Sequence, residues 1–420
     1  MMPQLQAILG LAVFISIAVL FSEQRRLPNW RLLAAGLGLQ IIFALLVFRI
    51  DFIQQALYGI NRAVAAIVSA TEAGTLFVFG YLGGDPANVA YPFVVEDPGS
   101  TVILAFRVLP LIMVFTVLSA VLWHYRILPL VVQGFSLVLS RSLGLGGAVG
   151  LGSAANIFLG MVEAPTLIRP YMKGLTRSEL FVLMSCGMAT VAGSVMVLYS
   201  VVLQDVIDNA LGHIITASVI SAPAAIMLAI IMVPGNNSQQ STNTAAISSQ
   251  YHNLMDAITR GTGDGLRLMI NVAAMLVVLV ALVALANSVL SLLPDLFGAP
   301  VTLQRLFSVL FAPLVWLMGV PWQEALVAGN LMGTKTVLNE LLAFIELAEL
   351  PASSLSDGST MIMTYALCGF ANFGSLGIMI AGLSGMCPER TSEIVNLAPR
   401  SMISGTLATC MTGAVAGLLL

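Results

Sequence analysis

Long apolar runs constrain this chain more than any other feature of its sequence. A helix needs about 20 apolar residues to cross a bilayer, and runs near that length recur throughout the 420 residues. Composition agrees, because 58% of the residues are hydrophobic and only 9% are charged, compared with about one quarter in soluble domains. We therefore predict an all-α polytopic membrane protein with eight transmembrane helices, near residues 4–21, 31–48, 102–124, 180–203, 212–233, 269–293, 361–384 and 399–420.

Three other stretches, 53–82, 127–165 and 300–345, are apolar but interrupted by Gly, Pro and isolated charges. Non-helical backbone at membrane depth is tolerated only where protein or a cavity covers it. We therefore predict interfacial helices and re-entrant hairpins in these stretches. The first span has no basic residue before it and is followed by Arg25 and Arg26. That polarity is the reverse of a signal peptide, so we expect this helix to be retained.

The basic residues predict the orientation. With both termini outside, twelve of the 17 Lys and Arg residues fall in inner loops, in line with the positive-inside rule. The polar segment 234–250 is then a cytoplasmic linker between two halves. The net charge of −3 gives no indication of a polyanionic partner, so we expect no nucleic acid. The basic residues left on the outer side are Arg49, Arg62, Arg107, Arg305 and Lys335.

Cysteines and histidines give no sign of a metal centre or a catalytic group. The histidines are scattered, and there is no Gly-rich loop with a Lys to hold phosphate. The cysteines lack metal-ligand spacing, so we interpret them as small packing residues. They are Cys186, Cys368, Cys387 and Cys410.

The two halves of the chain resemble each other. CGMAT at 186–190 returns as CGFAN at 368–372, and an acid lies upstream of each motif, at Glu163 and Glu340. Nearly the same spacing separates the two acids and the two motifs. We therefore predict a duplicated unit of one hairpin and one broken helix. Such repeats commonly have inverted topology in transporters, and we expect the first hairpin to enter from the cytoplasm and the second from outside.

Small residues in CGMATVAGSVM favour an opened helix, whose freed carbonyls need a partner that membrane cannot supply. A small cation such as Na⁺ is suitable, and Asn156 and Thr190 can add neutral oxygens. These two side chains can equally bridge packed helices by hydrogen bonds, and the sequence alone leaves both interpretations open.

The two acids are the leading site candidates. A carboxylate near the bilayer centre costs at least about 2.5 kcal/mol, so such residues usually face a cavity. An internal ion pair with Lys335 or Arg169 is the alternative. A carboxylate only accepts hydrogen bonds, which suits a hydroxyl-rich ligand such as a sugar. An intramembrane enzyme using Glu163 and Glu340 remains a rival hypothesis, whereas opposed hairpins argue against a channel.

Several long motifs resemble the concentrative nucleoside transporter family over nearly the whole chain: AANIFLGMVEAP, LIRPYM, TRSELF, GVPWQEALVAG, GTKTVLNELLAF and ALCGFANFGSLGIM. The resemblance implies a homotrimer in the lipid of the bacterial inner membrane that imports nucleosides with Na⁺, or with H⁺ in some members, by an elevator mechanism. It also implies two opposed hairpins, interfacial helices and four regions. These are scaffold helices at 1–125, a first transport-domain half at 126–233, a linker and scaffold helix at 234–299, and a second half at 300–420.

Carried over residue by residue, the resemblance implies two sites. Na⁺ lies near Asn156, Leu159, Thr190 and Val191, with backbone carbonyls from Leu159 and Val191. The base meets Gly160, Met161, Val162, Glu163 and Val195, the ribose is held by Glu340, Asn372 and Ser375, and Phe370 packs on the ligand. Many relatives have Gln and then Ser or Thr where this chain has Met161 and Val162. This departure favours a purine-preferring or broad transporter. A second departure, Leu341 in place of an aromatic residue, is expected to change only packing.

Overall fold

The computed structural model describes residues 3–25, 28–84, 89–95, 101, 103–235, 251–295 and 300–419, and every regular element among them is helical. The predicted linker lies mostly outside these residues. The helices are α1 (Pro3–Leu20), α2 (Trp30–Arg49), α3 (Asp51–Phe79), α4 (Pro110–His124), α5 (Ile127–Leu143), α6 (Gly147–Leu159), α7 (Glu163–Leu167), α8 (Arg177–Ala189), α9 (Gly193–Val202), α10 (Ala210–Met232), α11 (Leu254–Leu290), α12 (Leu303–Leu317), α13 (Ala325–Val337), α14 (Glu340–Glu349), α15 (Asp357–Leu367), α16 (Phe373–Met386) and α17 (Thr391–Leu419).

The order of elements repeats along the chain. Helices α5 to α10 and helices α12 to α17 each consist of one helix, two helices that meet at a short tip, a helix broken in the middle, and a long final helix. The tips lie at residues 160–162 and 338–339, and the breaks lie at 190–192 and 368–372. In each half the acid is the first residue of the helix that follows the tip. The duplicated order of helices, with a tip and a break in each half, is therefore present. That the tips belong to re-entrant hairpins, and that these enter from opposite membrane faces, stays a prediction.

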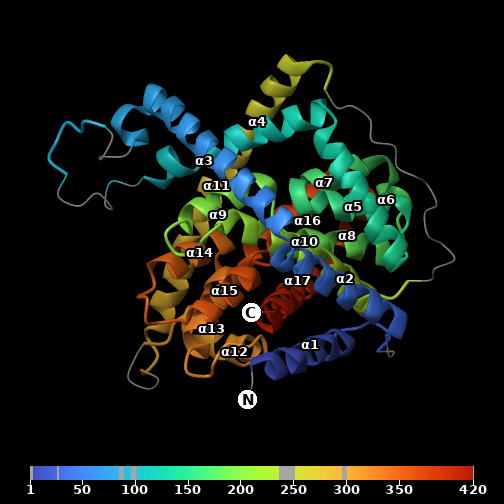
Figure 1. The fold of residues 1–420 in the computed structure, drawn as a ribbon. Coiled ribbons are helices and arrows are strands. Elements are labelled where there is room, and N and C mark those ends of the chain that lie inside the picture. Colours follow the sequence, from blue (N-terminus) through green and yellow to red (C-terminus); the bar gives the residue numbers. More distant parts are fainter. Residues whose placement is uncertain are drawn as a thin grey trace.

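The helices divide into a buried set and an exposed set. In the segment from α8 to α9 and in α10, 94% and 89% of the apolar window is buried, compared with 11% in α11 and 17% in α3. Helices α8, α10 and α17 pack against one another at the centre, with α1 and α12 beside α17 (Figure 1). The exposed apolar helices can only be stable against lipid or another protein chain, which agrees with a multi-pass membrane protein.

The structure differs from our expectation in the stretch 53–82. Gly59 and Gly74 do not interrupt it, and α3 is one continuous helix of 29 residues that ends at its C-cap Gly80. By length and composition α3 is one of eight helical segments in the described residues that could cross a membrane. The stretch 361–384 is not one helix, because α15 ends at Leu367 and α16 begins at Phe373. The length and composition of a helix do not by themselves settle whether it crosses the membrane, so the interfacial position of α3 stays a prediction.

Charged residues predicted to share the inner side lie close together. Glu23, in the loop after α1, binds Arg177 at the start of α8 (2.8 Å) and also Arg400 on α17. The hydrogen bond from Arg177 holds the pKa of the Glu23 carboxyl below its ordinary value. Lys335, however, was assigned to the outer side and is instead fully buried within α13. Its long alkyl stem suits the packed interior, and its ammonium has partners there.

The two ends of the described chain also lie near each other. A side chain built at Gly319, which has a φ of +112°, would come within 3.6 Å of the Pro3 carbonyl oxygen and 3.9 Å of Gly417 Cα. The ends of α1 and α17 are therefore neighbours beside the turn after α12 (Figure 1). This agrees with termini on one side of the membrane, and which side that is stays a prediction.

Candidate functional site

A cavity of about 130 Å³ lies where both tips and both breaks converge. Its wall includes every residue that the sequence assigned to the nucleoside: Gly160, Met161, Val162, Glu163, Val195, Glu340, Phe370, Asn372 and Ser375. These residues come from six segments, and only the tertiary fold brings them together. The remaining wall is mostly apolar and includes Leu268, Val272, Met275 and Leu279, all from α11.

The second half supplies the polar end of the cavity. Glu340 accepts hydrogen bonds at both carboxylate oxygens, from Tyr199 Oη at Oε1 (2.6 Å) and from Asn372 Nδ2 at Oε2 (2.8 Å). Asn372 is held in turn because its Oδ1 accepts from the Ser375 amide (2.7 Å) and caps α16. Each oxygen of Glu340 has one further lone pair. The network therefore presents a fixed acceptor to a ligand hydroxyl.

The first tip forms the opposite wall. Gly160 has a φ of +95°, and a Cβ there would lie 2.8 Å from Ala192 Cβ and 3.0 Å from Glu163 Oε2. Only glycine combines this backbone with such close packing. Glu163 is surrounded by protein atoms, but its side chain is accessible because it lies on the wall of the cavity. A ligand can therefore reach this carboxylate.

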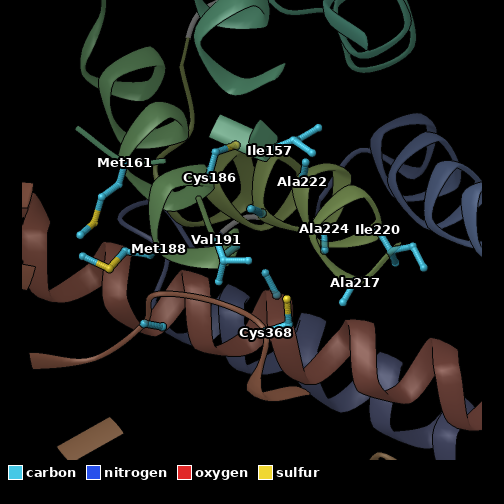
Figure 2. Close-up of a cluster of buried hydrophobic side chains, with 14 of the residues drawn as sticks. Ile157, Met161, Cys186, Met188, Val191, Ala217, Ile220, Ala222, Ala224 and Cys368 are labelled. Carbon is cyan, nitrogen blue, oxygen red and sulfur yellow. The ribbon is translucent and has the colours of Figure 1, made fainter. Parts of the chain in front are cut away.

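The two breaks touch each other through their backbones. The Phe370 amide donates to the Thr190 carbonyl oxygen (3.3 Å), so the second break is fixed to the first. Gly369 allows this approach, because a Cβ there would lie 2.8 Å from the Ala189 carbonyl oxygen. Figure 2 shows Val191 from the first break and Cys368 from the second in one buried cluster. All four cysteines are buried and free, in agreement with a packing role.

Oxygens suited to a small cation gather beside the first break. Asn156 and Thr190 are fully buried, and Asn156 Oδ1 has no hydrogen-bond partner. Thr190 Oγ1 lies 3.0 Å from the Asn156 carbonyl oxygen and 2.9 Å from that of Cys186. Leu159 is the last residue of α6, and Val191 lies in the break between α8 and α9. This set of neutral oxygens, including one buried acceptor without a donor, fits Na⁺.

The described residues do not pair either acid with a cation. None of the ion pairs in this part of the chain includes Glu163 or Glu340. The Lys335 ammonium instead donates to the Ala366 carbonyl oxygen (2.7 Å) and to Thr409 Oγ1 (3.0 Å). The alternative of an ion pair with Lys335 or Arg169 is therefore wrong in this structure, and the acids are free to act on a ligand.

Sequence reasoning missed two parts of the site. Tyr199 lines the cavity and binds Glu340, and it lies one helical turn after Val195 on α9. The apolar wall from α11 was not anticipated either. Its four residues recur at spacings of three and four, which places them on one face of a helix. Helical periodicity signals the shared face of the α11 residues, whereas nothing in the sequence signals that Tyr199 meets Glu340.

Comparisons with known proteins agree with this geometry. Residues 213–417 and 9–82 match the C-terminal and N-terminal parts of a family described as Na⁺ dependent nucleoside transporter, and residues 105–205 match a nucleoside recognition gate domain. An uncharacterized transporter of Haemophilus influenzae is 38% identical over 99% of this chain and 98% of its own length. The nucleoside permease NupC of Helicobacter pylori is 33% identical over 98% of this chain and 97% of its own.

Solved structures agree as well. The inward-facing, substrate-bound structure of CNTnw is 35% identical and covers 99% of this chain and 98% of its own, with a TM-score of 0.87. A CNTnw variant in an outward-facing state has the same identity, covers 99% of this chain and 97% of its own, and has a TM-score of 0.88. These relatives are transporters rather than enzymes, and the family description supports sodium as the coupling ion.

Proposed function

Because this chain belongs to the concentrative nucleoside transporter family, we propose that it imports nucleosides across the bacterial inner membrane with a sodium gradient. The observation that carries the proposal is the cavity, whose polar end is one carboxylate held by Tyr199 and Asn372. A nucleoside has hydroxyls on its sugar and a flat base. An acceptor at one end and apolar surface along the walls match those two parts.

In this proposal each half has its own task. Glu340, Asn372 and Ser375 bind the ribose hydroxyls, while the first tip and Val195 meet the base and Phe370 packs on the ligand. Na⁺ is bound by the Asn156 side chain, the Thr190 hydroxyl and the carbonyls of Leu159 and Val191, and bound there it supplies a positive charge between tip and break. Asn156 and Leu159 lie on α6, and the tip that directly follows α6 forms part of the cavity wall. A cation bound at these residues therefore orders the tip residues that contact the base. This order links the ion to the nucleoside.

The arrangement also favours an elevator mechanism. Every polar residue of the cavity comes from the two repeated halves, and the exposed helix α11 contributes only apolar side chains. A polar site can move along such a wall without breaking hydrogen bonds to it. We propose that residues 126–233 and 300–420 form the moving domain, and that 1–125 and 234–299 form the scaffold. Apolar surface on α3 and α11 suits lipid and the contacts of a homotrimer.

The first tip points to a preference for purines or to broad selectivity. Met161 and Val162 line the cavity and offer no hydrogen bond to the polar edge of a pyrimidine. Methionine is flexible and polarizable, which suits packing against the larger purine ring system. We therefore propose that inosine or adenosine is transported in preference to uridine.

The test is uptake of labelled inosine and uridine into proteoliposomes that contain the purified protein. Accumulation should require an inward Na⁺ gradient and should be lost when choline replaces Na⁺. Uptake driven by a pH gradient alone, with no effect of Na⁺, would contradict the sodium proposal. It would instead favour proton coupling through Glu163 or Glu340, the two carboxylates that line the cavity.

A further inference from the structure

Lys335 is a buried charge that the transport mechanism does not use. It lies in the last turn of α13, has no exposed surface, and belongs to none of the ion pairs among the described residues. Its ammonium donates to the Ala366 carbonyl oxygen on α15 and to Thr409 Oγ1 on α17. A lysine inside a membrane protein is costly unless it has such partners, so this position calls for a specific role.

The Ala366 carbonyl can accept from Lys335 because the helix is broken between α15 and α16. In a continuous helix the Phe370 amide would donate to Ala366, four residues earlier. Here the Phe370 amide donates to the Thr190 carbonyl oxygen instead. The carboxyl end of a helix carries partial negative charge, which a cation stabilises. Lys335 therefore supplies both the missing donor and the positive charge at this helix end.

The first half also has a broken helix, and among the described residues no lysine side chain bonds to an oxygen at that break. There α8 breaks after Ala189, and the nearby oxygens include Asn156 Oδ1, which has no partner. The cation at that helix end must come from solution, and it is the Na⁺ of the proposed function. Each broken helix thus has buried oxygens beside its break: in the first half one of them has no partner, and in the second half a lysine side chain binds one of them.

We propose that the Lys335 ammonium is a built-in cation that takes the place of an alkali ion at the break of the second half, and that it positions the hairpin carrying Glu340. Na⁺ coupling is then confined to the first half. Lys335 acts through α13 and Glu340 and touches neither the nucleoside nor the sodium, so it is a positioning residue. This inference rests on the proposed sodium site.

The experiment compares Lys335→Met, which removes the charge, with Lys335→Arg, which keeps it. Lys173→Met is the matched control, because Lys173 is exposed and pairs with Glu389 at 2.5 Å on the surface. The melting temperature of each purified variant is measured during a titration with NaCl against choline chloride. Inosine uptake is measured in proteoliposomes over a range of Na⁺ concentrations up to saturation. The wild-type flux ratio is measured with labelled sodium and labelled inosine.

We expect Lys335→Met to keep the wild-type Na⁺ midpoint for thermal stabilisation and to lose uptake by about tenfold or more at every Na⁺ concentration, since it leaves a buried carbonyl unpaired. Lys335→Arg should transport better than Lys335→Met, although methionine suits an apolar interior better than arginine does. A packing role predicts the opposite order. Lys173→Met should match wild type, and wild type should carry one Na⁺ for each inosine.

Three results would overturn the inference. The first is a Na⁺ midpoint for thermal stabilisation that shifts in Lys335→Met as far as it does in Asn156→Ala. The second is equal inosine uptake by Lys335→Met and Lys335→Arg. The third is a flux ratio of two Na⁺ per inosine in the wild type. The flux ratio decides if neither variant folds. If neither uptake nor stability of the wild type responded to Na⁺, the proposed function itself would be wrong. That outcome differs from a flux ratio of two Na⁺ per inosine, which would contradict only the role of Lys335.

Discussion

The first and second halves share an order of helices but differ in how their polar groups are completed. Beside the first break, the buried Asn156 Oδ1 has no donor. Beside the second, Asn372 Oδ1 caps α16, its Nδ2 binds Glu340, and Lys335 fills the open end of α15. An unpaired buried acceptor costs about 1–3 kcal/mol, so the first half has an opening that the second half lacks. We therefore propose that one repeated scaffold binds a mobile ion in its first copy and a sugar in its second.

Glu340→Gln should have the largest effect of the variants and should abolish sugar binding by the second half. We expect inosine uptake to fall by about 100-fold or more because several charge-assisted hydrogen bonds are weakened. Glutamine can still accept from Tyr199, but its amide nitrogen would face Asn372 Nδ2, a second donor. Transport assays in proteoliposomes measure the loss. The control is Glu346→Gln on the same helix, since Glu346 binds Asn330 and Thr334 outside the cavity. Full activity of Glu340→Gln would remove this acid from the site.

Asn156→Ala should weaken Na⁺ binding by the first half. The Na⁺ concentration for half-maximal uptake should rise by about 30-fold, since one contact with a charge contributes about 2 kcal/mol. High Na⁺ should restore the rate. Asn209→Gly is the control, because Asn209 Oδ1 is also buried without a partner and its φ of +53° suits glycine. An unchanged Na⁺ requirement in Asn156→Ala, or an equal shift in the control, would contradict a cation site at Asn156.

Tyr199→Phe sharpens the account of the second half. Removing one donor from the Glu340 carboxylate should raise the inosine KM by about tenfold while Na⁺ dependence stays unchanged. Tyr365→Phe is a close control, because its hydroxyl binds His213 Nδ1 at 3.0 Å and does not line the cavity. Kinetic assays at fixed Na⁺ distinguish the two. Wild-type kinetics in Tyr199→Phe would show that Glu340 needs no support from this hydroxyl.

Met161→Gln and Val162→Thr, alone and combined, test the base side and carry the smallest expected effect. Each new neutral hydrogen bond to a pyrimidine contributes about 0.5–1.5 kcal/mol, so uridine should gain about threefold over inosine for each change. Competition of labelled inosine uptake by uridine gives the ratio. A wild-type preference for uridine, or a double variant with an unchanged ratio, would contradict the role of the first tip.

Much of this division could be predicted from the sequence. Gly, Ala, Thr and Ser within apolar runs indicate places where a helix opens, and the repeated acid and CG motif align the two halves. The motifs also identified the residues that the fold gathers around the cavity. Spacing predicts the tips and breaks because these are local backbone properties that depend on a few neighbouring residues, whereas the individual cavity residues came from the resemblance to the transporter family.

Other features depend on tertiary contacts and could not be predicted. A hydropathy pattern treats a lysine as a sign of exposure, whereas Lys335 is buried because α15 and α17 supply acceptors. Tyr199 resembles its apolar neighbours until Glu340, far along the chain, is placed beside it. The glycines of α3 were expected to interrupt a helix that proved continuous. For Lys335 and Tyr199 the deciding partner lies on another element.

The most direct test of the division between the halves is equilibrium binding of labelled Na⁺ and labelled inosine to purified wild type, Asn156→Ala and Glu340→Gln. We expect Glu340→Gln to bind Na⁺ as wild type does and to lose inosine. We expect Asn156→Ala to lose Na⁺ at concentrations that saturate wild type, and to bind inosine weakly and without any response to Na⁺. If Glu340→Gln lost both ligands equally, or if Asn156→Ala kept wild-type Na⁺ binding, the assignment of the ion to the first half and the sugar to the second would be wrong.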